Sequence, residues 1–277
     1  MPHAEQADGA GGFGPDQLVD EIAGAIRLGP SHMLGLFENL TKRYSVDRLK
    51  GDMVERVNLL LFMRPSSPIL LPGQEPSTDA EEMREAEQTV RRLADLSPKI
   101  TSEIRDVRED SAMAADFGVQ ELPVLLIAGR AKNRVRFVGT PRGNLFEGML
   151  KAIWRASTGD DELPAEFVKD LGRVASEVYL RVFVSPTCPA CKPVIDAALR
   201  MALTSSKVRA DIIDATAFLD LADRFDVYGV PTTILNDRFS LGPVPEEMLL
   251  EAVIHASDPS YPAPQIPYVA YPSCGKL

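Results

Sequence analysis

Apolar residues follow two patterns along this chain: short continuous runs, and longer segments with apolar positions three or four residues apart. The first pattern is typical of buried strands and the second of amphipathic helices. The runs predict strands at 57–63, 100–107, 124–127, 135–138, 179–185, 208–213, 232–235 and 238–241. The spaced segments predict helices at 80–96, 111–117, 144–157, 165–176, 189–204, 216–225 and 245–255, with two more between residues 18 and 46. This alternation of strands and helices indicates an α/β fold.

The second half of the chain repeats the order of elements in the first half. When Pro123 is aligned with Pro231, Phe117 also falls on Phe225. Each proline begins an apolar strand, where a missing N–H removes no ladder hydrogen bond, and a tight junction of this kind favours a cis peptide bond. The repeat predicts two copies of one βαβ–ββα unit. The alternative is two unrelated α/β units that share a common pattern.

Composition divides the chain into four predicted regions. Residues 1–17 are rich in Gly, Ala and polar residues and are predicted to be disordered. Residues 18–158 are predicted to hold a helical extension and the first unit, and residues 165–256 the second unit. Residues 257–277 carry several prolines and tyrosines and are predicted to be an extended tail. The helices of the extension either pack on the first unit or make contacts in a homodimer.

The motif Cys188-Pro189-Ala190-Cys191 joins a predicted strand to a predicted helix. Two thiols separated by two residues can form and open a disulfide with little backbone movement, and the start of a helix stabilises a thiolate. The motif therefore predicts thiol–disulfide exchange, with an accessible Cys188 as the nucleophile and Cys191 as the thiol that resolves the mixed disulfide. Lys192 adds a positive charge nearby.

Other interpretations of the motif have less support. A structural zinc site needs four ligands, and His3, His32 and His255 do not occur at the spacing of zinc ligands. The sequence therefore predicts no metal and no other cofactor. Two inert buried thiols remain an alternative.

The first unit lacks the thiols. When Pro65 is aligned with Pro186, Ser67 falls on Cys188 and Leu70 on Cys191. No histidine lies near enough in the sequence to activate the hydroxyl of Ser67 as a nucleophile. This segment is therefore predicted to be a loop without a catalytic role.

Two segments of the second unit resemble thioredoxin-fold proteins. Residues 183–191 resemble the start of glutaredoxin-like proteins, in which a strand leads into a CPxC motif, and residues 225–232 resemble the segment that leads into the cis-proline of thioredoxin. Two such units resemble the protein disulfide oxidoreductases, also called glutaredoxin-like proteins, over residues 50–256. The resemblance implies two tandem thioredoxin-like units, each a central mixed β-sheet flanked by helices.

The resemblance also implies which residues around the thiols bind substrate. They are Thr187, Pro189, Ala190, Val230 and Pro231. The turn at Val230 and Pro231 is expected beside the thiols, where the Val230 backbone can pair with an extended substrate strand.

The chain departs from this family in two places. Members of the family often have a CxxC motif in each unit, and Val182 stands where thioredoxin keeps a buried aspartate. A tandem with a thiol-free first unit also resembles the N-terminal domain of the flavoprotein that reduces bacterial peroxiredoxin. That domain passes electrons through its second unit only.

Charge and cysteine content narrow the partners and the compartment. The net charge of −10 argues against nucleic acid and anionic membranes, which need clustered Lys and Arg. Residues 1–17 lack the pattern of a signal peptide, and no apolar stretch is long enough to span a membrane, so the cytoplasm is expected. The third cysteine, Cys274, is either a free thiol in the tail or a third redox group that can reach Cys188.

The sequence therefore predicts an enzyme, a thiol–disulfide oxidoreductase that acts on protein disulfide or dithiol substrates with a thiol reductant. Two alternatives stay open. One is a dedicated electron mediator to a peroxidase-type partner, and the other is a non-enzymatic binding or chaperone-like module.

Overall fold

The computed structural model describes residues 46–64, 78–129, 134–159 and 163–261. All of them belong to one unit that extends over residues 45–277. The predictions for residues 1–45, for Ser67 and its loop, and for residues 262–277 with Cys274 lie outside the described residues.

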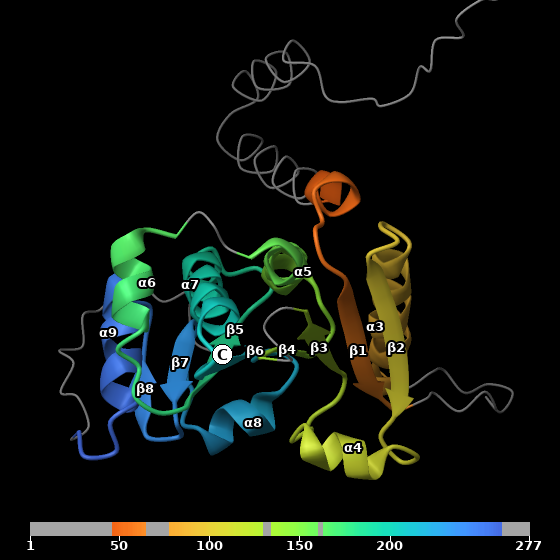
Figure 1. Ribbon diagram of the computed structural model, residues 1–277. Coiled ribbons are helices and arrows are strands. Elements are labelled where there is room, and N and C mark those ends of the chain that lie inside the picture. Colours follow the sequence, from red (N-terminus) through yellow and green to blue (C-terminus); the bar gives the residue numbers. More distant parts are fainter. Residues whose placement is uncertain (1–45, 65–77, 130–133, 160–162, 262–277) are drawn as a thin grey trace, which may run out of the picture. The chain divides into compact units, whose positions relative to one another are not determined.

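Eight strands in the described part of the chain form one mixed sheet (Figure 1). Their bounds are β1 (Val57–Met63), β2 (Ile100–Asp106), β3 (Val124–Ala128), β4 (Val135–Val138), β5 (Val178–Val184), β6 (Val208–Asp214), β7 (Thr232–Leu235) and β8 (Phe239–Leu241). Their order across the sheet is β2-β1-β3-β4-β6-β5-β7-β8. Every strand agrees with a predicted one to within one residue at each end, because most of them are short, buried apolar runs bounded by turns.

The sheet consists of two halves with the same topology. β1 is parallel to β2 and antiparallel to β3, and β5 is likewise parallel to β6 and antiparallel to β7. An antiparallel strand, β4 or β8, completes each half. An aromatic pair recurs too: the ring centroids of Phe62 and Phe117 are 6.0 Å apart, and those of Phe183 and Phe225 are 5.9 Å apart. The predicted internal repeat is therefore confirmed.

The two halves join edge to edge, which the sequence analysis did not predict. β4 of the first half pairs in parallel with β6 of the second, from Val135 opposite Ala210 to Val138 opposite Ile213. The backbone N–H of Ala210 donates a 2.9 Å hydrogen bond across this junction to the carbonyl of Arg134. Because the sheet is continuous, the domain boundary between residues 158 and 165 stays a prediction.

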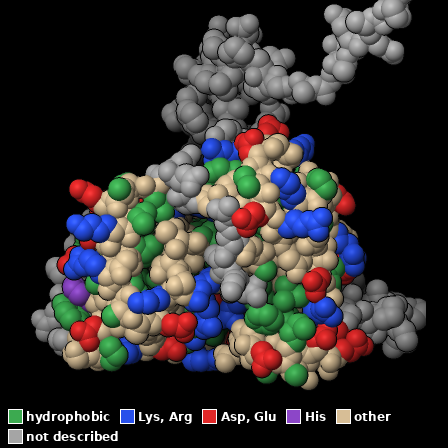
Figure 2. All heavy atoms as spheres, viewed as in Figure 1, with side chains coloured by type: hydrophobic (Ala, Val, Ile, Leu, Met, Phe, Trp, Pro, Cys, Tyr) green, Lys and Arg blue, Asp and Glu red, His purple; other side chains and the backbone are tan. Residues whose placement is uncertain are grey.

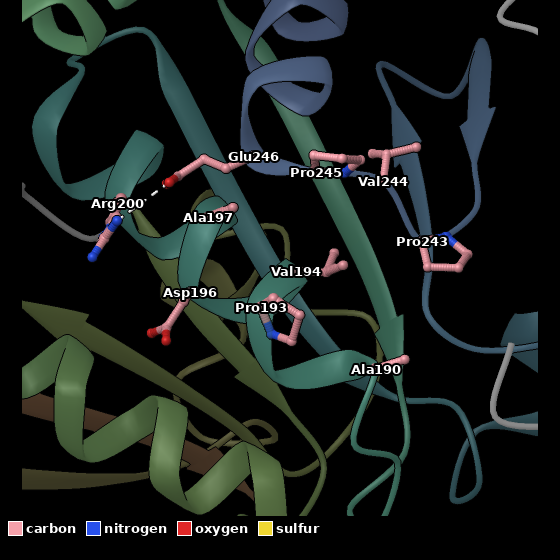
Figure 3. A pocket seen from close by; sticks show the side chains of 10 residues that line it. All are labelled: Ala190, Pro193, Val194, Asp196, Ala197, Arg200, Pro243, Val244, Pro245 and Glu246. Atoms are coloured by element: carbon pink, nitrogen blue, oxygen red, sulfur yellow. Dashed lines mark hydrogen bonds and ion pairs between the residues drawn. The ribbon is translucent and has the colours of Figure 1, made fainter. Parts of the chain in front are cut away.

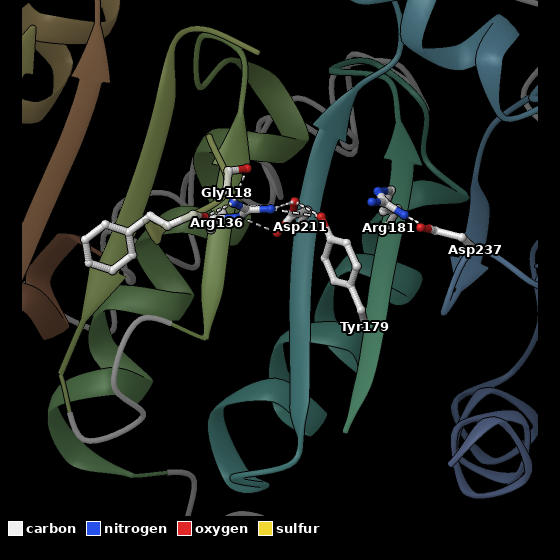
Figure 4. A network of polar contacts seen from close by, with 7 residues as sticks. Gly118, Arg136, Tyr179, Arg181, Asp211 and Asp237 are labelled. Atoms are coloured by element: carbon white, nitrogen blue, oxygen red, sulfur yellow. Dashed lines mark hydrogen bonds and ion pairs between the residues drawn. The ribbon is translucent and has the colours of Figure 1, made fainter. Parts of the chain in front are cut away.

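A buried ion pair lies at the junction (Figure 4). Nε of Arg136 on β4 donates a 2.7 Å hydrogen bond to the carboxylate of Asp211 on β6, and Nη2 of Arg136 pairs with the same carboxylate. The hydroxyl of Tyr179 on β5 donates to Asp211 and accepts a 2.9 Å hydrogen bond from Arg136. Burial alone would lower the pKa of Arg136, but the Asp211 carboxylate outweighs burial and raises that pKa, so Arg136 stays charged.

The helix ends differ more from the sequence prediction than the strand ends do. The helices of the described part include α3 (Thr78–Ala94), α4 (Ser111–Asp116), α5 (Gly143–Thr158), α6 (Ala165–Leu171), α7 (Cys191–Thr204), α8 (Leu219–Arg224) and α9 (Glu246–Ala256). α6 ends before residue 176 because the chain turns there, and the N–H of Ala175 donates to Oγ of Ser257 at 2.9 Å. α7 begins two residues later than predicted because residues 188–191 form a tight turn.

Acidic and basic side chains are interspersed on the face of the described unit that Figure 2 shows. Within the described residues, no helix combines the length and the apolar character that a membrane crossing requires.

Candidate active site

The motif that carries Cys188 and Cys191 lies between the end of β5 and the first turn of α7. Two backbone hydrogen bonds shape the turn, from Cys188 N to Ser185 O at 3.3 Å and from Cys191 N to Cys188 O at 3.1 Å. The loop before β7 lies opposite, and Sγ of Cys188 is 3.9 Å from the carbonyl oxygen of Val230. The structure therefore brings Cys188 and the Val230 turn together.

Both prolines that open a strand follow a cis peptide bond, as the repeat predicted. The bond between Val230 and Pro231 is cis in the second half, and the bond between Leu122 and Pro123 is cis in the first. The position aligned with Cys188 in the first half is a serine, so a cysteine accompanies the cis-proline in the second half alone.

The two cysteines of the motif differ in state. Cys191 is a free thiol with no exposed surface at the first position of α7. Cys188 takes part in a disulfide bond and is 3% exposed. A disulfide sulfur has no proton to donate, so its approach to Val230 is a contact and not a hydrogen bond. Cys188 is therefore not open to solvent in this state, contrary to the expectation of an accessible nucleophile.

The other residues expected to bind substrate differ in exposure. Thr187 and Pro189 are exposed and Ala190 is half-buried, whereas Val230 and Pro231 are buried. Tyr228, which the sequence analysis did not single out, is 69% exposed close to the cis-proline turn. Their role in substrate binding stays a prediction.

Comparison with known proteins identifies the fold. Residues 178–255 match the family described as thioredoxin domain. The NTD_N/C domain of alkylhydroperoxide reductase AhpF from Enterococcus faecalis is similar in structure, with a TM-score of 0.66 and 21% identity over 78% of this chain and 98% of that chain. A protein disulfide oxidoreductase from Aeropyrum pernix has a TM-score of 0.62 and 21% identity over 78% of this chain and 91% of that chain. This chain has a tandem thioredoxin fold. The predicted fold class is confirmed.

Curated relatives match the tandem thioredoxin fold over part of their length. An NADH dehydrogenase from Bacillus subtilis is 22% identical over 169 residues, which are 58% of this chain and 33% of that protein. The AhpF protein of alkyl hydroperoxide reductase from Staphylococcus aureus is 20% identical over 181 residues, which are 65% of this chain and 33% of that protein. The chain thus spans about a third of the length of these relatives.

The free thiol of the second thioredoxin unit is a weak acid. Burial raises the pKa of Cys191 to about 11, and a backbone hydrogen bond at Ser185 offsets only part of that rise. Cys191 is therefore protonated at neutral pH. A thiol of this kind is suited to resolve a mixed disulfide rather than to begin the attack, because the thiolate is the nucleophile.

Alkylation of Cys191 in the native protein is expected to stay slow at neutral pH and to accelerate as the pH rises toward about 11. In denaturant the thiol loses its buried environment, so its pKa falls toward the ordinary value of 9.0 and the profile moves to lower pH. Iodoacetamide labelling of a Cys188→Ser variant, read by peptide mass spectrometry, measures both profiles. Native and denatured profiles with the same midpoint would contradict the shifted pKa.

The first thioredoxin unit contributes two side chains to this region that the sequence analysis missed. Both Asn144 and Glu147 lie on α5, which packs beside α7 (Figure 1). The buried carboxylate of Glu147 lies 3.2 Å from Nζ of Lys192 and 3.5 Å from Nζ of Lys151. The charge of Lys192, predicted to act near Cys188, is therefore balanced by Glu147. No local pattern marks these residues, because α5 and α7 belong to different units.

A groove of about 500 Å³ begins beside Ala190 and extends between α7 and the start of α9 (Figure 3). Arg200 and Glu246, which form an ion pair at 3.2 Å, contribute to its lining. The apolar lining residues are Ala190, Pro193, Val194, Ala197, Pro243, Val244 and Pro245. An apolar groove that begins within the thiol motif offers a binding place for a side chain next to a reacting disulfide.

Proposed function

We propose that this protein is a thiol–disulfide oxidoreductase that works through Cys188 and Cys191. One observation carries the proposal: Cys188 is engaged in a disulfide while Cys191, three residues further on, is a free buried thiol. The cis-Pro231 turn beside Cys188 and the match of residues 178–255 to the thioredoxin domain support the same chemistry.

In the proposed cycle the thiolate of Cys188 attacks one sulfur of a substrate disulfide. A bond forms between Cys188 and that sulfur, the substrate S–S bond breaks, and the leaving sulfur takes the electron pair and then a proton. Cys191 next loses its proton and attacks Sγ of Cys188, which releases the second substrate thiol and leaves a Cys188–Cys191 disulfide. A thiol reductant supplies two electrons to restore both thiols, and the reverse sequence oxidises a dithiol substrate.

Protein substrates are proposed to lie between the Val230 turn and the apolar groove. Thr187 and Pro189 are exposed at the thiol motif, and Ala190 belongs to both the motif and the groove. The exposed ring of Tyr228 adds apolar contact area on the other side of the cis-proline turn. An extended segment in this place would bring its disulfide to Cys188 once the disulfide at Cys188 has opened.

The state of Cys188 favours a redox role for Cys274. Because Cys191 is free and the chain has three cysteines, Cys274 is the one other cysteine of this chain that Cys188 can bond to. We therefore propose that Cys274 is a third redox group and not a spectator thiol. Attack of Cys191 on Sγ of Cys188 would then release Cys274 as a thiolate.

A dedicated electron mediator for a peroxidase is the second candidate. It is favoured by the similarity to the alkyl hydroperoxide reductase protein AhpF, both in sequence and in the structure of its NTD_N/C domain. The chemistry at Cys188 and Cys191 would be the same, but one protein would receive the electrons. A reducing cytoplasm is the proposed setting for either candidate, and a homodimer is compatible with both.

Trapping of the mixed disulfide tests these candidates. In a variant with both Cys191→Ser and Cys274→Ser, Cys188 can still attack but no thiol of the chain can resolve the product. Covalent complexes are therefore expected on non-reducing gels, in larger amount than with Cys191→Ser alone because Cys274 can no longer act. Mass spectrometry then identifies the trapped proteins.

The control for this experiment is Cys188→Ser, which is expected to trap nothing. Many trapped proteins support a general oxidoreductase, and a single peroxidase-type protein supports the mediator. No trapped protein in any variant would contradict both and favour the binding module.

A further inference from the structure

The amino end of α5, in the thiol-free unit, lies against the loop that carries Cys188. Gly143 begins α5 with a φ of 48°, a region that side chains with a Cβ rarely adopt. A Cβ atom at this position would lie 2.1 Å from the carbonyl oxygen of Pro186. The glycine therefore permits a close approach of two backbones, and the N–H of Asn144 donates a 2.9 Å hydrogen bond to the same Pro186 carbonyl.

The side chain of Asn144 is buried and bonds to the loop twice. Its Nδ2 donates to the carbonyl oxygen of Ser185 at 3.0 Å and to that of Cys188 at 2.6 Å. Both carbonyls also accept the backbone bonds that shape the turn, from Cys188 N at 3.3 Å and from Cys191 N at 3.1 Å. One amide group thus connects the two carbonyl groups that accept the hydrogen bonds of the turn.

We propose that Asn144 is a positioning residue for the redox pair, so that the unit without thiols supplies part of the redox site. The inference rests on the proposed function. The bond to the Cys188 carbonyl sets the plane of the Cys188–Pro189 peptide, and with it the direction of Sγ relative to Cys191 and to the free N–H groups of the first turn of α7. Without this bond the turn keeps only its two long backbone hydrogen bonds, and the attack geometry is less well defined.

Two substitutions at Asn144 separate hydrogen bonding from shape. Asn144→Ala removes the side chain, and Asn144→Asp keeps its shape but places a carboxylate against two carbonyl oxygens. Asn236 offers a matched control at the opposite end of β7 from Val230: its Oδ1 accepts from Tyr179 N at 2.7 Å and its Nδ2 donates to Ala256 O at 3.0 Å. Asn236→Ala therefore removes a comparable amide bridge away from the thiols.

The readouts are the rate of disulfide exchange, the pH profile of Cys188 alkylation after reduction, and the melting temperature. We expect both Asn144 variants to exchange disulfides about tenfold more slowly than the unmodified protein, with Asp slower than Ala, and the midpoint of the Cys188 profile to move to higher pH. Asn236→Ala should lower the melting temperature without moving the profile.

The proposal is overturned if the Asn144 variants keep the unmodified pH profile and exchange rate while losing only stability. If the unmodified protein exchanges no disulfides, the proposed function fails instead. The alkylation profile, which needs no turnover, then still decides whether Asn144 sets the reactivity of Cys188. Should Asn144→Ala fail to fold, Asn144→Asp, which keeps the backbone bond to Pro186, provides the same comparison.

Discussion

Cys188→Ser is expected to abolish disulfide exchange, with a fall in turnover of roughly 10³-fold or more. A serine hydroxyl is not ionised at neutral pH and cannot form the S–S bond of the mixed disulfide. Cys191 is not placed to replace it, because Cys191 has no exposed surface and its pKa is raised to about 11. Reduction of insulin or of glutathione disulfide, followed at fixed reductant concentration, measures the effect.

Two matched variants make this result specific to Cys188. Cys191→Ser should keep the first attack and lose resolution, so that it forms mixed disulfides without turning over. Cys274→Ser should keep turnover, because Cys188 and Cys191 together complete the cycle. Retained turnover in Cys188→Ser would refute the assignment of the nucleophile.

Arg136→Met is expected to lower the free energy of unfolding by about 3–5 kcal/mol, the cost of leaving one member of a buried ion pair without its partner. The Asp211 side chain is 4% exposed, and after the substitution only the Tyr179 hydroxyl would remain to bond its carboxylate. Burial, with the nearby Asp211 charge, raises the pKa of Tyr179 to about 12, so this hydroxyl stays protonated and cannot supply the missing positive charge. Chemical denaturation of both proteins measures the difference.

Arg91→Met is the control for the same change of residue type at an exposed site. Arg91 pairs with Glu87 at 2.8 Å on α3, and its side chain is 62% exposed. Exposed pairs of this kind contribute at most about 1 kcal/mol, so the variant should unfold almost as the unmodified protein does. Equal losses in the two variants would contradict a special role for the pair at the junction.

The sequence predicted the strands well because each strand is a local feature. A run such as Val57–Met63 contains its own evidence in consecutive apolar residues. Helix ends depend on tertiary contacts instead, and α6 shows this: its chain continues as a turn because Ala175 bonds to Ser257, which lies 82 residues away in the sequence.

The candidate site was predictable only where its residues stand in one motif. Cys188, Cys191 and Pro231 came from spacing and from the resemblance to thioredoxin-fold proteins. Asn144 escaped because its partners lie 41 and 44 residues away in another unit, and no periodicity records such a contact.

The junction between the halves did leave a signal in the sequence. Arg136 and Asp211 are charged residues inside otherwise apolar strands, and a buried charge generally requires an opposite charge. Pairing these two residues before the structure was known would have placed β4 beside β6. The sequence analysis did not use this signal, and it therefore treated the two units as separate.

The edge-to-edge union of β4 and β6 has a consequence for any attempt to isolate the redox half. A fragment cut out after residue 158 would present β6 as a bare strand, with unpaired backbone N–H and C=O groups along Ala210–Ile213 and an unneutralised Asp211 among them. Such an edge recruits other chains, so the excised half should self-associate rather than behave as an independent module. The catalytically silent half thus acts as the solubilising cover of its active neighbour.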